Sequence, residues 1–448
     1  MRTFQTGEVS VADMMQAREE RVERQQRLLQ EGRALACLTM NIPGPRKTSP
    51  LVYIAFQEGK RLLEAELPQA VLKEEALQKT GFEAYYLLPA EPHAAKRALC
   101  AIEDGTPLGR LFDIDVLTAA GEKISREELG FAPRRCFLCG EPAFACARSR
   151  THSVAQMREE IERRILAFYR QQTAERLSRA AVEALQAEAR TTPKPGLVDE
   201  RNCGSHPDMN LSLFLTSAMA LKNYFLRCAQ VGFDCAAHAA FPALQEAGIL
   251  AEREMLAVTG GVNTHKGAIF SLGILCAAAA NCAVRFQDDP RQICQTAGSI
   301  ARPAMEAHFA SLASACTFGE RLYLSRGVRG IRGEAADGFP SLLALLPGFE
   351  EEAALLSARE AGVRALIRLL SRIQDTTLLK RGGEEGERFA RARAREIERA
   401  GFPAEAIVAL DDDMIARNLT CGGAADLLAC LYFLHAIASS GQSPENLP

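Results

Sequence analysis

The sequence predicts a multidomain protein with an N-terminal α/β domain followed by an all-α domain. Its 448 residues correspond to roughly two to three domains of ordinary size. Residues 1–150 contain several short strand-like runs, whereas from residue 190 onward the strand signals vanish and Ala/Leu-rich helical segments alternate with short polar motifs. Tryptophan is absent, so the core is expected to consist largely of Ala, Leu and Ile, which suits packed helices.

The elements of the α/β domain are expected in a definite order. Residues 11–31 are charged and carry apolar side chains at helical spacing, which predicts an amphipathic helix. Strands are predicted at residues 34–40, 51–57, 83–88 and 111–118. Residues 156–190 contain neither Gly nor Pro and are expected to be helical. This stretch joins the two domains, which we place at residues 1–170 and 171–448.

Composition limits the class of protein. The chain is 48% hydrophobic and 24% charged, and 53 basic residues balance 56 acidic ones to a net charge of −3. This balance predicts neither a nucleic-acid partner nor a membrane surface. The N-terminal residues do not resemble a signal peptide, and the uncharged segment 267–284 is read as a buried helix. With 14 cysteines expected as reduced thiols, a soluble, cytoplasmic protein is predicted.

Asp113 and Asp115 form the first candidate site. They alternate with apolar residues, and residues i and i+2 of a strand point to the same face. Two neighbouring carboxylates repel each other unless a cation lies between them, and Mg²⁺ carrying substrate phosphates fits this need. The alternative that stays open is a half-exposed strand whose two aspartates are simply solvent-exposed and bind no metal.

Basic residues near these motifs could receive phosphate. Arg46 and Lys47 follow a rigid Pro-Gly-Pro turn, and Arg110 precedes the aspartates. For Arg46 and Lys47 the alternative is an ordinary surface turn.

A cluster of soft ligands follows within seventeen residues. Its spacing could close a tetrahedral zinc site made of Cys136, Cys139, Cys146 and His152. The spacing is not one of the common finger patterns, and the neighbouring arginines would serve equally well as a phosphate-binding surface.

The ordered motifs NIPGPRK, GRLFDIDVL and RRCFLCGEPAFACARSRTH carry a resemblance over about residues 5–170. They resemble the holo-acyl-carrier-protein synthase of citrate lyase, also called apo-citrate lyase phosphoribosyl-dephospho-CoA transferase. The resemblance implies a nucleotidyltransferase-like domain that transfers phosphoribosyl-dephospho-CoA to a serine of the acyl carrier protein (the gamma subunit) and releases diphosphate. It also implies Asp113 and Asp115 as Mg²⁺ ligands, with Arg46, Lys47 and Arg110 as phosphate contacts.

The C-terminal half has five polar motifs, each joining a base or a glycine turn to an acid or an amide. They are TPKPGLVDERNCGSHPDM (192–209), GGVNTHKG (260–267), GVRGIRGEAADGFP (327–340), QDTTLLKRGG (374–383) and NLTCGGAADLL (418–428). Each is weak by itself, because a Gly-Gly before a helix is usually a turn and an Asp there is usually a cap. Their occurrence together favours a polyphosphate site.

These motifs resemble triphosphoribosyl-dephospho-CoA synthase over about residues 175–448. That family makes the prosthetic-group precursor from ATP and 3′-dephospho-CoA and releases adenine, so the chain resembles a fusion of two enzymes that act in sequence. Thr420-Cys421 departs from the Ser-Pro expected in relatives.

The reaction needs carboxylates near an oxocarbenium-like transition state and cations near the triphosphate. The candidate carboxylates, some of which are expected to hold Mg²⁺, are Asp199, Asp208, Glu334, Asp375 and Asp426. The candidate substrate and phosphate contacts are Lys194, Asn263, His265, Lys266, Arg332, Lys380, Arg381, Gly422 and Gly423.

Two alternatives stay open at this point. The helical half could be a kinase-like or nucleotide-hydrolysing enzyme, which would release ADP instead of adenine. The N-terminal half could be a non-catalytic module that only docks the carrier protein.

Overall fold

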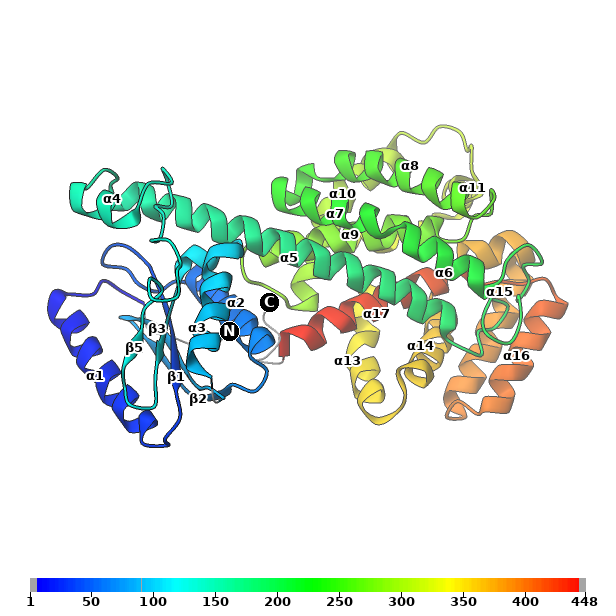
Figure 1. Ribbon diagram of the computed structural model, residues 1–448. Helices are drawn as coiled ribbons and strands as arrows, with labels where there is room; N and C mark the ends of the chain where they lie inside the picture. The colour runs from blue at the N-terminus through cyan, green and yellow to red at the C-terminus, as the bar shows by residue number, and fades with distance from the viewer. Residues whose placement is uncertain (1–5, 90, 443–448) are drawn as a thin grey trace. The chain divides into compact units, whose positions relative to one another are not determined.

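The computed structural model describes residues 6–89 and 91–442, and the chain divides into two compact units (Figure 1). Unit 1 ends at Gln172 and unit 2 begins at Thr173. The boundary lies inside one long helix, α5 (Val154–Arg190). The multidomain prediction, with a sheet at the N-terminal end and helices after it, is therefore confirmed.

Unit 1 contains a five-stranded antiparallel sheet with the strand order β2-β3-β1-β4-β5. Its elements are α1 (Val11–Leu29), β1 (Leu35–Met40), α2 (Pro50–Glu66), β2 (Val71–Gln78), β3 (Gly81–Leu87), α3 (Pro92–Gly105), the 3₁₀ turn η1 (Gly109–Leu111), β4 (Phe112–Leu117), β5 (Lys123–Ile124), α4 (Ala143–Ser149) and the first half of α5. The nucleotidyltransferase-like character of this domain stays a prediction.

The two faces of the sheet bury different side chains. Even-numbered strand residues such as Leu38 and Ile114 join a large core with α2, α3 and Ile161 of α5. Odd-numbered residues such as Cys37 pack in a smaller cluster with Leu28 of α1. Figure 1 accordingly shows α1 on one side of the strands and α2 and α3 on the other.

The prediction of a strand at residues 51–57 is wrong, because this segment lies in α2. The apolar run Leu-Val-Tyr-Ile-Ala-Phe is compatible with either a buried strand or a buried helix. The residues at the start of the segment favour the helix. The Ser49 hydroxyl oxygen accepts a hydrogen bond from the amide of Val52 at 3.2 Å, and Pro50 occupies the first turn. Sequence analysis also missed β2, a largely exposed strand that carries charged residues and lacks clear alternation.

The described residues of unit 2 form helices joined by loops, with no strand among them. Its elements are the second half of α5, α6 (Leu211–Ala220), α7 (Lys222–Asp234), the 3₁₀ turn η2 (Ala237–Ala239), α8 (Phe241–Val258), α9 (Lys266–Ala283), α10 (Pro290–Ala310), α11 (Phe318–Arg326), α12 (Gly330–Ala336), α13 (Pro340–Leu355), α14 (Ala358–Arg372), α15 (Thr376–Arg399), α16 (Ala404–Ala416) and α17 (Gly422–Gln442).

Helix α9 lies at the centre of this unit, packed against α7, α8, α10 and α17. Helix α7 approaches it so closely that a Cβ at Gly232 would lie 2.1 Å from the carbonyl oxygen of Ala277. Two segments, Lys266–Ala283 and Gly422–Ser439, are long and apolar enough to cross a membrane by length and composition alone. They are 78% and 56% buried inside the protein, as core helices are. These two segments are α9 and the larger part of α17. Both helices begin within polar motifs of the sequence, at residues 260–267 and 418–428.

Candidate active sites

Asp113 and Asp115 lie on one face of β4, as the alternation predicted. Phe112 and Ile114 between and beside them are buried in the opposite face, while both aspartates are half-exposed. A cation pairs with each carboxylate: Arg134 lies 3.0 Å from Asp113, and Lys123 lies 2.7 Å from Asp115. Arg134 also pairs with the buried Glu103 at 2.5 Å. The charges of the aspartate pair are thus balanced by two basic side chains of the same unit.

The three predicted phosphate contacts of unit 1 all bond to the protein itself. Arg46 pairs with the exposed Glu8 at 3.3 Å, and the Lys47 ammonium donates to the carbonyl of Ile42 at 2.7 Å. Arg110 donates to the carbonyl of Arg135 at 3.0 and 2.6 Å. Of the three, Arg110 lies nearest to the aspartate pair in its bonding: it is bonded to Arg135, the residue that follows Arg134, and the Arg134 side chain pairs with Asp113.

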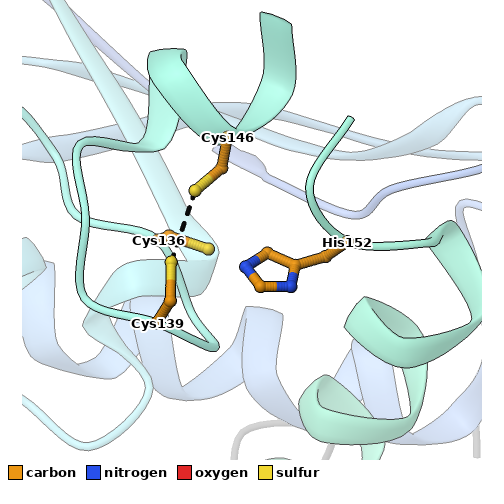
Figure 2. A group of neighbouring side chains, drawn as sticks. All are labelled: Cys136, Cys139, Cys146 and His152. Atoms are coloured by element: carbon orange, nitrogen blue, oxygen red, sulfur yellow. Dashed lines mark hydrogen bonds between the residues drawn. The ribbon is translucent and has the colours of Figure 1, made fainter. Parts of the chain in front are cut away.

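The soft ligands also come together in unit 1. Figure 2 shows Cys136, Cys139, Cys146 and His152 as one group, and their ligand atoms all lie within 4.8 Å of one another.

In unit 2 the polar motifs line two adjoining cavities of about 190 and 600 Å³. The smaller is lined by, among others, Glu188, Lys194, His206, His265, Gly422 and Asp426. The larger is lined by, among others, Arg329, Glu334, Arg372, Asp375, Gly423 and Asp426. The residues common to both walls are Asn263, Lys266, Gly267, Thr377 and Asp426. Segments far apart in the sequence therefore meet at one place, near the starts of α9, α15 and α17.

Asp199 holds its own loop together and does not line either cavity. Its carboxylate accepts the Thr192 hydroxyl at 2.7 Å and the amide of Lys194 at 2.9 Å. It also accepts the amides of Arg201 and Asn202. These four hydrogen bonds indicate a structural carboxylate. Asp208 is exposed and lies outside both cavities.

Asp375 is a helix cap that joins two helices. Its side chain accepts the amides of Thr377 and Leu378 at the start of α15, at 2.8 and 3.1 Å, and the amide of Ala424 in α17 at 2.9 Å. Burial raises the pKa of its carboxyl, and these backbone donors oppose that rise. Glu334 accepts the amide of Ser341 at 2.7 Å, and burial raises its pKa as well.

Asp426 combines burial with like charges. Burial raises the pKa of its carboxyl well above the ordinary value, and the nearby carboxylates of Glu188 and Asp375 raise it further. The amide of Ala268, in the first turn of α9, opposes this rise. The carboxylate fits against α9 because residue 267 is glycine: a Cβ there would lie 1.9 Å from an Asp426 oxygen. Asp426 is therefore a carboxyl on the wall common to both cavities whose pKa is raised by burial and by neighbouring carboxylates.

The candidate cations fall into two groups. Lys194 and Lys266 line the cavities. Lys194 is buried, and its Nζ forms an ion pair with Glu188 Oε1 at 2.6 Å. Lys266 is exposed, and its Nζ forms an ion pair with Glu252 Oε2 at 2.7 Å. Three others lie outside both cavities: Arg332 contacts His308 at a different cavity, Lys380 is exposed, and Arg381 bonds to the loop that contains Ser205.

His265 is a neutral imidazole at the smaller cavity. Its Nδ1 lies 2.8 Å from the Ser217 hydroxyl, and its buried Nε2 has no hydrogen-bond partner in the described structure. Burial lowers its pKa to about 3, and the charge of Lys194 adds to this effect. Asn263 accepts the amide of Lys266 at 3.2 Å and so closes the turn before α9.

Sequence analysis missed Glu188, Arg329 and Arg372. Glu188 lies in the long charged helix α5, where nothing distinguishes it from the other acids. Arg329 and Arg332 both belong to the motif GVRGIRGEAADGFP, and only Arg332 was predicted to bind phosphate. Sequence does not tell which side of a short helix faces a cavity. Arg329 pairs with Asp337 and lines the larger cavity.

Comparison with known proteins agrees with this two-part layout. Residues 9–168 match the model of the apo-citrate lyase phosphoribosyl-dephospho-CoA transferase family, and residues 174–444 match that of the ATP:dephospho-CoA triphosphoribosyl transferase family. Protein CitXG of Haemophilus influenzae is 36% identical, over 96% of this chain and 97% of its own length. This chain belongs to the CitXG family.

Further relatives extend the family assignment. Protein CitXG of Leuconostoc mesenteroides subsp. cremoris is 31% identical over 98% of this chain and 99% of its own length. A protein of Pectobacterium carotovorum named probable 2-(5''-triphosphoribosyl)-3'-dephosphocoenzyme-A synthase is 37% identical over 58% of this chain and 88% of its own length. As a CitXG family member, the chain is a bifunctional transferase of citrate lyase prosthetic-group biosynthesis.

Proposed function

We propose that unit 2 makes 2′-(5″-triphosphoribosyl)-3′-dephospho-CoA from ATP and 3′-dephospho-CoA, and that unit 1 transfers the product's phosphoribosyl-dephospho-CoA group to a serine of the citrate lyase acyl carrier protein. The first reaction releases adenine and the second releases diphosphate. The observation that carries the proposal is the pair of adjoining cavities in unit 2, which share a wall containing Asp426 and Lys266.

The synthase reaction joins two substrates at one carbon atom. The 2′-oxygen of dephospho-CoA forms a bond to the ribose C1′ of ATP, the bond from C1′ to adenine breaks, and adenine leaves. The hydroxyl proton passes to a base. We place the reacting end of one substrate in each of the two adjoining cavities, so that the reacting atoms meet at the shared wall.

Asp426 is the base that we propose. It lies on the shared wall, and its raised pKa makes the ionised form a stronger base than an ordinary aspartate. Glu188 and Asp375 add negative charge nearby, which stabilises an oxocarbenium-like transition state. The same acidic group would accept Mg²⁺ carried by the triphosphate.

Lys266, Arg329 and Arg372 are the triphosphate contacts that we propose. All three line the larger cavity, and Lys266 also lines the smaller one. The triphosphate stays intact on the product, so these cations bind substrate and product alike.

In unit 1, Asp113 and Asp115 are the proposed Mg²⁺ ligands of the transfer step. The serine oxygen of the carrier attacks the α-phosphorus, and the bond to the β-phosphate oxygen breaks as diphosphate leaves. Carboxylates are the ligands that Mg²⁺ prefers, and the exposed Lys123 is free to yield its place beside Asp115 to the ion. Arg134 would then remain as a contact for the phosphates.

A two-step assay on the full chain tests the proposal. With ATP and 3′-dephospho-CoA, chromatography should detect adenine; ADP release would overturn the synthase assignment. With pre-made precursor and apo-carrier, modification should proceed without ATP. Asp426→Asn should abolish only the first step and Asp113→Asn only the second, whereas a carrier that binds but is never modified would support a docking module.

A further inference from the structure

We propose that unit 1 holds one structural Zn²⁺ ion, bound by Cys136, Cys139, Cys146 and His152. No step of the transferase chemistry uses these side chains. The proposal rests on the arrangement of the four ligand atoms, on the backbone that presents them, and on the lack of any other core in this segment.

The ligand atoms already surround a common point. All four lie within 4.8 Å of one another. In a tetrahedral site with Zn–S about 2.3 Å and Zn–N about 2.0 Å, ligand atoms lie about 3.5–3.8 Å apart. Cys139 and Cys146 have their sulfurs 3.3 Å apart, much farther than the S–S bond of about 2.05 Å in a disulfide. The group therefore fits a metal ion better than a disulfide.

The fourth ligand is also in position. Figure 2 shows the His152 ring with one nitrogen pointing toward the cysteine sulfurs. The Nε2 atom of His152 is buried and has no hydrogen-bond partner in the described structure. A buried ring nitrogen without a partner costs free energy, which a bond to a metal would remove.

The backbone presents the first two cysteines as a tight turn. The amide of Cys136 donates to the carbonyl of Glu141 at 2.7 Å, and Arg135 bridges to Pro142. Gly140 completes the turn at a φ of 73°.

A second turn delivers the other two ligands. Cys146 lies on the short helix α4, which ends at Arg150 in the left-handed conformation, at a φ of 51°. The amide of Thr151 then donates to the carbonyl of Cys146 at 3.2 Å. This reversal brings His152 back to the cysteines.

The segment has almost no apolar core of its own. Among residues 132–153 Phe137 alone is buried, and none of the residues of α4 is buried. So small a core does not hold a defined conformation in water, and natural proteins hold such segments with disulfides or structural metals. A zinc ion would supply this missing cross-link, with three thiol protons released to solvent on binding.

The zinc cross-link would also fix the backbone that carries Arg134, the residue that pairs with Asp113. Arg134 lies in this segment, two residues before Cys136, and pairs with Asp113, while Arg110 donates to the carbonyl of Arg135. Loss of zinc should therefore impair carrier modification and leave adenine release unchanged. This consequence rests on the proposed function; the metal site itself does not.

Metal analysis of the full chain tests the site directly. Protein purified from zinc-supplemented cells should contain one zinc per chain by mass spectrometry of the elements. Replacement by Co²⁺ should give thiolate-to-cobalt absorption and the visible bands of a tetrahedral site. Cys146→Ser should lose both, whereas Cys316→Ser, at an exposed cysteine of unit 2, should keep both.

Alkylation keeps the test decisive if Cys146→Ser fails to fold. In the wild-type chain, zinc should protect Cys136, Cys139 and Cys146 together from alkylation, and a chelator should expose all three while Cys316 reacts throughout. Absence of zinc and of the cobalt spectrum would overturn the proposal. A Cys139–Cys146 disulfide in the purified protein, or unchanged zinc in Cys146→Ser, would overturn it too.

Discussion

The two units treat their acidic residues in opposite ways. In unit 1, Asp113 and Asp115 are half-exposed and each is paired with a basic side chain at the surface. In unit 2, Asp426 is half-buried near the carboxylates of Glu188 and Asp375, and burial and these charges raise its pKa. An exposed carboxylate can exchange a surface cation such as Lys123 for a metal ion at little cost, whereas a carboxyl with a raised pKa holds a proton more readily until a cation neutralises the site. The first arrangement suits a carrier protein that must reach the site from outside, and the second suits small substrates enclosed in cavities.

The largest expected effect is that of Asp426→Asn on the synthase step. Loss of a general base typically lowers the rate by about 10²–10⁴-fold, and kcat/KM for adenine release should fall by this factor. In the wild type, kcat/KM should rise with pH through the raised pKa of Asp426, because only the ionised form accepts a proton. A pH profile of the variant that keeps the same rise would contradict the assignment.

The same variant should not be less stable than the wild type. Because the pKa of Asp426 is higher in the folded than in the unfolded chain, the folded state binds more protons between the two values. Stability therefore falls as pH rises through this window, and Asn removes the loss. Thermal unfolding of wild type and variant at low and high pH measures this, and a lower Tm of the variant at high pH would indicate a structural role.

Lys266→Ala should have the next largest effect. The lost contact to the triphosphate would be worth about 1.5–3 kcal/mol, or roughly a tenfold to hundredfold loss in kcat/KM for ATP. Modification of the carrier from pre-made precursor should not change. Glu252→Gln, which removes only the partner of Lys266, is the matched control, and an equal loss in both variants would place the effect in their ion pair.

Asp199→Asn should act on stability and not on a chemical step. Its carboxylate accepts four hydrogen bonds, so leaving donors unpaired should cost about 1–3 kcal/mol of unfolding free energy. Asp208→Asn, at an exposed aspartate of the same motif, should leave the unfolding free energy unchanged. Chemical denaturation compares the two, and equal stability of both variants would refute the structural role of Asp199.

The smallest effect is expected for Lys123→Ala. Its ion pair with Asp115 is exposed to water, and such pairs contribute about 0–1 kcal/mol. If Lys123 yields its place to Mg²⁺, the variant should need less Mg²⁺ for half-maximal carrier modification. A higher Mg²⁺ requirement would show instead that Lys123 helps to bind phosphate.

Sequence analysis succeeded where a local pattern fixes geometry. The alternation around Asp113 and Asp115 correctly predicted two carboxylates on one face of a strand, and the absence of Gly and Pro correctly predicted the long helix α5. It failed at residues 51–57, where an apolar run fits both a strand and a helix and only Ser49 and Pro50 indicate the helix.

In unit 2, sequence pattern could find the polar loops but not rank their residues. Asp199, Asp375 and Asp426 all lie in polar motifs that contain glycine, yet the first accepts bonds only from its own loop and the second caps α15. The roles of Asp375 and Asp426 depend on contacts with residues more than forty positions away, such as Ala424 for Asp375 and Ala268 for Asp426. Glu188 was missed for another reason: it pairs with Lys194, six positions away, but the charged helix α5 gives no sign of which of its acids faces a cavity.

Gly267 and Asp426 are separated by more than 150 positions, but a side chain at position 267 would force the Asp426 carboxylate to move. Any side chain at position 267 would place its first carbon 1.9 Å from an oxygen of Asp426, on the backbone of a helix that is packed on all sides. A lineage that kept the aspartate would have to keep the glycine, while a lineage that lost the aspartate would be free to vary position 267. In relatives that have lost the synthase activity, positions 267 and 426 should therefore change together.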